Sequence, residues 1–147
     1  MAKDLAKAAK DGGIRYFLIS FVDLFGVLRA KLVPAAAIAA MQRDGAAFAG
    51  FATHLDLTPA HPDVFVIPDP ASLIRLPWNK EVGWLAADPI MNGKPIAHAP
   101  RNVLKRQIEA ASAQGYRMKT GVEAEFFVIN RDGSAMVNAP TTQEAVS

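Results

Sequence analysis

The chain has 147 residues, of which 51% are hydrophobic and 20% are charged, enough apolar material for one globular domain or a small domain plus part of another. Sixteen basic and fourteen acidic residues leave a net charge of only +2, so there is no basic surface of the kind that binds nucleic acid. The absence of cysteine excludes a disulfide framework. No apolar stretch is long enough for a signal peptide or a membrane span, and we expect a cytoplasmic protein.

The first 45 residues predict a helix, a hairpin and a second helix. Residues 1–13 form a short helix that Gly12 and Gly13 end. The two β-rich runs within 14–33 are joined through "DLFG" and predict a hairpin. We expect the second helix to begin at Pro34 and to end at Gly45.

Five prolines divide the segment 45–77, so it cannot be one long helix or a central strand. Short edge strands are expected near 64–67 and 73–76. The run "EVGWLAAD" then predicts another strand, which Asp88 and Pro89 close.

The clearest helix covers residues 98–115, where Pro100 lies near the first turn and Gly115 is the stop signal. Its basic face, formed by Arg101, Lys105 and Arg106, is expected to be solvated.

After this helix the sequence predicts a strand over 116–129 and then a turn at Asp132 and Gly133. The polar residues from there to Ser147 supply no closing element. An unfinished sheet would expose the apolar face formed by Val122, Phe126 and Val128, and we expect poor solubility.

Within the predicted strand, "GVEAEFFVIN" places Glu123 and Glu125 on one face, roughly 6 to 7 Å apart, because side chains alternate along a strand. That spacing suits two carboxylates that hold adjacent divalent cations such as Mg²⁺ or Mn²⁺. The alternative is a sheet with one wet face, on which the glutamates are solvated or paired with lysines.

Other candidate sites are weaker. His54, His61 and His98 are too scattered for a metal pattern and are expected to have structural or surface roles. No Gly-rich dinucleotide-binding or P-loop motif is present.

Four stretches carry a family resemblance: "VDLFGVLRAKLVP", "FAGFATHLDLTPAHPDVFVIPD", "APRNVLKRQI" and "GVEAEFF". In order and approximate spacing they resemble the N-terminal part of the glutamine synthetase family over residues 14–130, and they look most like its type III branch, which includes the γ-glutamylmethylamide synthetases. The resemblance implies an α+β fold: a β-grasp domain over 14–100 after the N-terminal helix, and the first helix and strand of an incomplete catalytic α/β domain over 101–147.

The resemblance also implies an activity, the ATP-dependent joining of glutamate to ammonia or methylamine through a γ-glutamyl phosphate intermediate. By position, Glu125 would hold the metal near the glutamate substrate and Glu123 the metal that bridges the ATP phosphates. Family members form homo-oligomeric rings in which each active site is built between neighbours.

Two departures from the family pattern matter. Ala49 in "FAGFA" stands where ammonia-using relatives place an aspartate that binds and deprotonates ammonium. The remaining metal ligands and ATP-contacting residues of the family fall beyond Ser147, so we expect this chain alone to be an inactive fragment. The alternative is a non-catalytic β-grasp module that binds other subunits.

Overall fold

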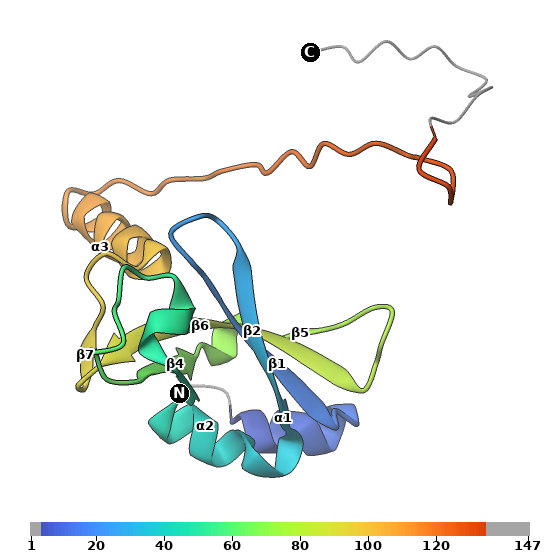
Figure 1. Ribbon diagram of the computed structural model, residues 1–147, viewed down its shortest axis with the longest axis horizontal. Helices are drawn as coiled ribbons and strands as arrows, with labels where there is room; N and C mark the ends of the chain where they lie inside the picture. Colours follow the sequence, from blue (N-terminus) through green and yellow to red (C-terminus); the bar gives the residue numbers. More distant parts are fainter. Residues whose placement is uncertain (1–3, 135–147) are drawn as a thin grey trace. The chain divides into compact units, whose positions relative to one another are not determined.

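A computed structural model describes residues 4–134 of the chain (Figure 1). Residues up to Arg117 form one compact unit, and those from Met118 onward belong to a second. The end of the predicted 101–147 region, residues 135–147, lies outside the described residues. Among the described residues, no helix is long and apolar enough to cross a membrane.

The N-terminal helix α1 (Leu5–Gly12) confirms the prediction. The Asp4 side chain accepts hydrogen bonds from the amides of Ala6 and Lys7 and so caps the first turn. Gly13, at φ 65°, ends the helix in the left-handed conformation that favours glycine.

The predicted hairpin is also confirmed, as β1 (Tyr16–Val22) and β2 (Leu28–Pro34) pair antiparallel. Pro34 is therefore the last strand residue, opposite Tyr16, and the prediction that it begins a helix is wrong. A 3₁₀ turn, η1 (Ala35–Ala37), comes first, and α2 (Ile38–Asp44) follows it. The strand continues this far because a proline at the end of an edge strand removes no ladder hydrogen bond that the sheet needs.

The proline-divided segment contains more structure than the sequence indicates. It holds β3 (Ala46–Phe48), the 3₁₀ turns η2 (Gly50–Thr53) and η3 (Pro70–Ser72), and the strands β4 (Val64–Pro68) and β5 (Ile74–Arg75). The prediction that β4 is an edge strand is wrong, because it lies between β3 and β6. Its only proline stands at its end, so the interior of the strand keeps its donors.

The longest strand, β6 (Val82–Met91), holds the sheet together. Its first half pairs parallel with β1 and its second half antiparallel with β4. The prediction that Asp88 and Pro89 close this strand is wrong, since it continues past both and then pairs with β7 (Lys94–Pro95). The Pro89 carbonyl still accepts a hydrogen bond from the Ile96 amide, at 3.0 Å.

The strand order β2-β1-β6-β4-β3 gives a mixed α/β fold whose sheet curls until it is nearly closed into a barrel. The curling is seen in side-chain contacts between strands far apart in this order: the ring of Phe21 on β1 meets Phe48 on β3 edge-on, at 5.2 Å between centroids. The core is formed by buried hydrophobic residues of α1, α2 and the sheet: Leu5, Ala9, Phe17, Ile19, Phe21, Ile38, Val64, Val66 and Leu85.

The last helix, α3 (Pro100–Ala113), matches the predicted 98–115 helix and begins at Pro100, as the sequence indicates. The predicted strand over 116–129 is wrong for this structure, which shows no strand there and only an isolated bridge residue at Ile129. A strand exists only where a second strand accepts its backbone hydrogen bonds, and none of residues 116–128 has such a partner. The turn at Asp132 and Gly133 is confirmed, with Gly133 at φ 84°.

Candidate functional site

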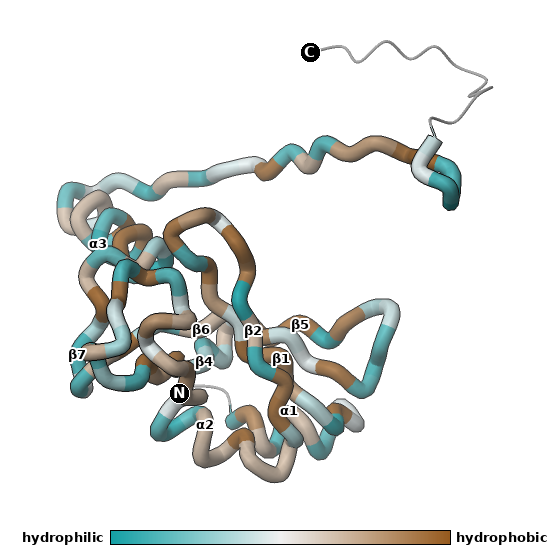
Figure 2. The backbone as a smooth tube through the Cα atoms, viewed as in Figure 1, coloured by the Kyte–Doolittle hydropathy of each residue, from teal (hydrophilic) through white to brown (hydrophobic). Residues whose placement is uncertain are grey.

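The glutamates of the predicted metal site lie in the extended segment 118–134, where hydrophobic and polar stretches follow one another (Figure 2). Both Glu123 and Glu125 are exposed. Across residues 4–134, no three His, Cys, Asp or Glu side chains gather into a group that could hold a metal ion. Because divalent ions such as Mg²⁺ take about six oxygen ligands, the two carboxylates supply an incomplete ligand set in this part of the chain.

The segment Ala49–Thr53 contains the position at which the sequence departs from the family pattern. Ala49 is exposed and lies between the end of β3 and the turn η2. A Cβ atom on Gly50 would lie only 2.5 Å from the Pro62 carbonyl oxygen, so only glycine fits here. The buried Thr53 hydroxyl donates to the Gly50 carbonyl at 2.6 Å. These contacts fix the backbone directly after Ala49.

The residues after this segment are tied to two neighbouring elements. The Leu24 amide, from the hairpin loop, donates to the His54 carbonyl at 3.3 Å. His98 Nε2, just before α3, lies 2.7 Å from the Leu55 carbonyl oxygen. His61 Nδ1 lies 3.0 Å from the Thr58 hydroxyl. The contacts of His61 and His98 are with the loop itself, which agrees with the structural role expected for them.

The hairpin loop is organised by a carboxylate that sequence reasoning did not single out. Asp23 is fully buried. Its Oδ1 accepts the amides of Phe25 and Val27, each at 2.9 Å, and its Oδ2 accepts Arg29 Nε at 2.7 Å. Burial alone would raise the pKa of Asp23, but the amide of Val27, the Arg29 guanidinium and the amide of Phe25 outweigh it and hold the pKa below its ordinary value. The signal was the D-x-x-G turn pattern itself.

A second charged group, which we call the α3 clasp (Arg101, Lys105, Asp69 and Asp88), joins α3 to the sheet. Arg101 donates to Asp69 from Nη2 and to Asp88 from Nε, the latter at 2.7 Å. Lys105 also pairs with Asp88. The expectation that this basic face is solvated is therefore wrong for Arg101, which is 27% exposed, because its two acidic partners come from distant parts of the sequence, while Lys105 and Arg106 are exposed as expected.

The buried amide of Asn102 completes this attachment. Its Nδ2 donates to the carbonyls of Pro89 and Ile96, at 2.8 and 2.9 Å. The first turn of α3 is thus held by polar contacts, while Leu104 and Ile108 further along the helix are more than half exposed.

Comparison with known sequences gives a matching family model and several similar relatives. The family model "Glutamine synthetase, catalytic domain" matches residues 97–146. The "Glutamine synthetase" of Rhizobium leguminosarum bv. phaseoli is 59% identical over 144 residues, which is 98% of this chain and 33% of the relative. The "Glutamate--methylamine ligase" of Methyloversatilis universalis is 36% identical over 124 residues, which is 83% of this chain and 28% of the relative.

Solved structures agree with these matches. The structure titled "Apo GmaS without ligand" aligns with a TM-score of 0.88 and 55% identity, covering 96% of this chain and 34% of that one. A second, "GmaS/ADP complex-Conformation 1", aligns with a TM-score of 0.74 and 57% identity over 76% of this chain and 26% of that one. The chain spans about a third of the length of the curated relatives that match nearly all of it.

Proposed function

This chain is similar along nearly its whole length to a glutamine synthetase, of which it covers 33%, and from this premise we propose that it is the N-terminal portion of an ATP-dependent glutamate–amine ligase. The observation that carries the proposal is the match at 59% identity over 98% of the chain. The reaction would form γ-glutamyl phosphate and then an amide with ammonia or a small alkylamine.

Glu123 and Glu125 are the residues of this chain that would hold the metals. Their chemistry fits, since both are exposed carboxylates and hard oxygen ligands suit Mg²⁺ or Mn²⁺. Bound divalent ions would neutralise the negative charges that meet when a carboxylate attacks a phosphoryl group. By resemblance, Glu125 would hold the metal on the glutamate side and Glu123 the metal on the ATP side.

The chain alone should be inactive, because its two carboxylates have no third acidic or histidine partner among the described residues. Purified chain should release no phosphate above background with ATP, glutamate, Mg²⁺ or Mn²⁺, and either ammonium or methylamine. Turnover by this chain would contradict the proposal that it is inactive by itself.

The ligase proposal itself is tested in the longer protein that carries this chain. There, Glu123→Gln and Glu125→Gln should each abolish most of the phosphate release. Glu109→Gln is the matched control, since Glu109 is an exposed glutamate on α3. Equal activity in all three variants would show that the E-x-E pair has no part in the reaction.

Ala49 is the residue that we propose to set the choice of amine. An alanine in place of an aspartate leaves the amine pocket less acidic and more apolar, which favours methylamine or another small alkylamine over ammonium. The names of the relatives do not agree on the amine: one that is 59% identical is a glutamine synthetase, and one that is 36% identical is a glutamate–methylamine ligase.

The test compares Ala49→Asp with Ala52→Asp, which adds the same charge to an exposed position three residues on. The ratio of kcat/KM for ammonium to kcat/KM for methylamine should rise in Ala49→Asp and stay unchanged in Ala52→Asp. A ratio that does not change in Ala49→Asp would remove Ala49 from the amine site.

The wider organisation follows from the same resemblance. We propose that residues 14–100 are a β-grasp domain, that residues 101–147 begin the catalytic domain, and that the complete protein forms homo-oligomeric rings with sites between neighbours. Native mass spectrometry of the longer protein would test the ring, and a monomer would contradict it.

One observation favours a second candidate, a non-catalytic module that binds other subunits. The compact unit ends at Arg117, before the segment that carries both glutamates. Binding to a ligase subunit is the measurement that tests the second candidate. A binding module would associate with the subunit, and its Glu123→Gln and Glu125→Gln variants would bind as well as the wild-type chain.

A further inference from the structure

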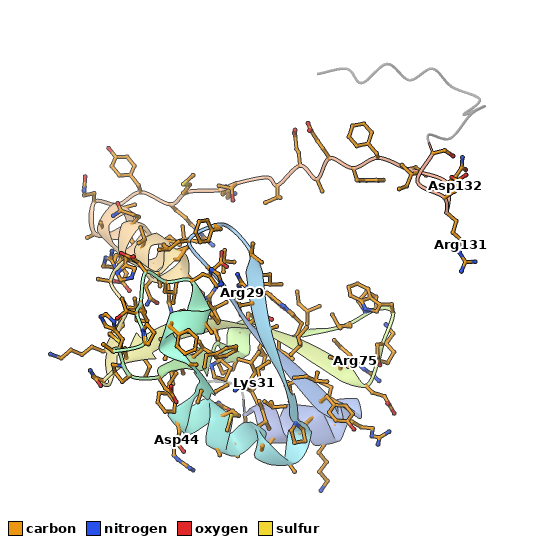
Figure 3. The ribbon with its side chains drawn as sticks, in the orientation of Figure 1. Arg29, Lys31, Asp44, Arg75, Arg131 and Asp132 are labelled. Carbon is orange, nitrogen blue, oxygen red and sulfur yellow. The ribbon has the colours of Figure 1, made fainter. Side chains whose placement is uncertain are left out.

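The curled sheet leaves one seam, between its two end strands β2 and β3. These strands terminate the order β2-β1-β6-β4-β3 and are not paired with each other. The seam is bridged by Lys31, labelled on β2 in Figure 3, whose Nζ donates to the Ala47 carbonyl of β3. The same ammonium lies 4.9 Å from the centroid of the Phe48 ring, a cation–π distance.

The strand on the far side of this seam has one paired edge, and Ala46 is its residue that is buried in the core. β3 has three residues and pairs with β4 alone, through Ala46–Phe48 opposite Val66–Val64. Its other edge is covered by the Lys31 ammonium, and the Phe48 ring packs edge-on against Phe21 at 5.2 Å. Lys31, Phe48 and Phe21 therefore form a continuous contact from β2 across β3 to β1, which we call the seam cluster.

The chain leaves β3 at Phe48 and enters Ala49 directly. The segment Ala49–Thr53 is therefore attached directly to the end of β3. Within it the Ala52 amide donates to the Ala49 carbonyl at 2.9 Å, and Gly50 lies close against the Pro62 carbonyl. We propose that Lys31 is a positioning residue: by closing the seam it sets where the rigid segment Ala49–Thr53 stands relative to the sheet. Its consequence for amine choice rests on the function proposed above for Ala49.

Amide hydrogen exchange on the 147-residue chain tests the proposal without any assumption about catalysis. In Lys31→Met the amides of Phe48 and Ala52 should exchange about tenfold faster, since one charge-assisted hydrogen bond is lost at the seam. The amide of Gly115, which donates to the Ser112 carbonyl at the end of α3 and opens locally, should exchange at the wild-type rate. Lys31→Arg should restore slow exchange, because a guanidinium also donates and also stacks on an aromatic ring.

Lys94→Met is the matched control, since Lys94 is an exposed strand lysine on β7, away from the seam. Two results would overturn the proposal. Unchanged exchange at Phe48 and Ala52 in Lys31→Met would mean that the seam holds without the lysine. Faster exchange to the same degree at Gly115 would mean that the substitution loosens the chain far from the seam and that Lys31 does not position the segment.

The catalytic consequence is read separately, in the longer protein. Lys31→Met should change the kcat/KM ratio of methylamine to ammonium by about tenfold and leave the KM for ATP unchanged, while Lys31→Arg should keep the wild-type ratio. If exchange responds as expected and the ratio does not, Lys31 positions the segment but the segment has no part in amine choice. If the longer protein has no ligase activity, the proposed function fails and the exchange result stands.

Discussion

Two β-rich stretches of this chain, "YFLISFV" in β1 and "VEAEFFVI" at 122–129, look alike in sequence and differ completely in structure. β1 is paired on both sides, with β2 and β6, and its Phe17, Ile19 and Phe21 are buried. In the second stretch Val122 is 92% exposed and Phe127 is 95% exposed, and it contains no strand, only an isolated bridge residue at Ile129. The difference teaches that a sequence rich in β-forming residues is compatible with a strand, but that a strand forms only where a neighbouring backbone pairs with it.

The comparison predicts that equal truncations have unequal effects in the two regions. Phe17→Ala should lower the free energy of unfolding by about 3 to 5 kcal/mol, because Phe17 is fully buried and its removal leaves a cavity. Phe127→Ala should change it by less than about 0.5 kcal/mol. Urea unfolding of the two variants measures both values, and a loss above about 1 kcal/mol in Phe127→Ala would mean that the second stretch contributes to folding stability.

Glycine replacements sharpen the same contrast. Gly50→Ala should cost about 1 to 3 kcal/mol, since the new Cβ would lie 2.5 Å from the Pro62 carbonyl oxygen and force the backbone apart. Gly121→Ala should cost nothing or stabilise slightly, because no atom lies within 4 Å of its Cβ position. Thermal unfolding followed by circular dichroism distinguishes the two, and equal melting temperatures would contradict the close contact at Gly50.

The α3 clasp should matter more than an exposed arginine of the second region. Arg101→Met should lower the free energy of unfolding by about 1 to 2 kcal/mol, because Asp69 and Asp88 would keep their partly buried charges without this partner. Arg131→Met, at an exposed position, is the control. The clasp would be structurally unimportant if chemical denaturation gave the same midpoint for both variants.

The smallest expected effect is a difference in pH dependence between two aspartates. The pKa of Asp23 is held below its ordinary value despite burial, so the unfolded chain takes up the proton first as the pH falls. Stability from Asp23 is therefore present above about pH 4 and is lost as the pH falls through the folded pKa. Asp23→Asn should flatten the acid side of the stability curve.

Asp132 supplies the comparison from the second region. Hydrogen bonds from the Ser134 hydroxyl and amide lower the pKa of Asp132, but this carboxylate is exposed and belongs to a local turn outside the compact unit. Asp132→Asn should leave the pH dependence of global unfolding unchanged. Stability curves between pH 2 and 7 for both variants check the pair, and equal flattening would contradict the role given to buried Asp23.

Much of the fold could be predicted from local signals. Asp4 and Gly13 bound α1, "DLFG" marks the hairpin, and Pro100 begins α3, because capping and turn residues act within a few positions of one another. The errors at Pro34 and Pro89 have a common reason. A strand tolerates proline where no neighbouring strand needs a hydrogen bond from the amide that proline lacks. The neighbouring strand is distant in sequence, so local signals do not show it.

The candidate site divides in the same way. The sequence by itself determined the E-x-E pair, the alanine at position 49 and the family resemblance, since these depend on residue identity and order. Only the tertiary structure decided that Asp23 is buried beside Arg29, that Arg101 meets Asp69 and Asp88, and that Lys31 bridges β2 and β3. The partners of Arg101 lie 13 and 32 residues away in the sequence, and the Ala47 carbonyl lies 16 residues from Lys31, so only the folded chain brings these groups together.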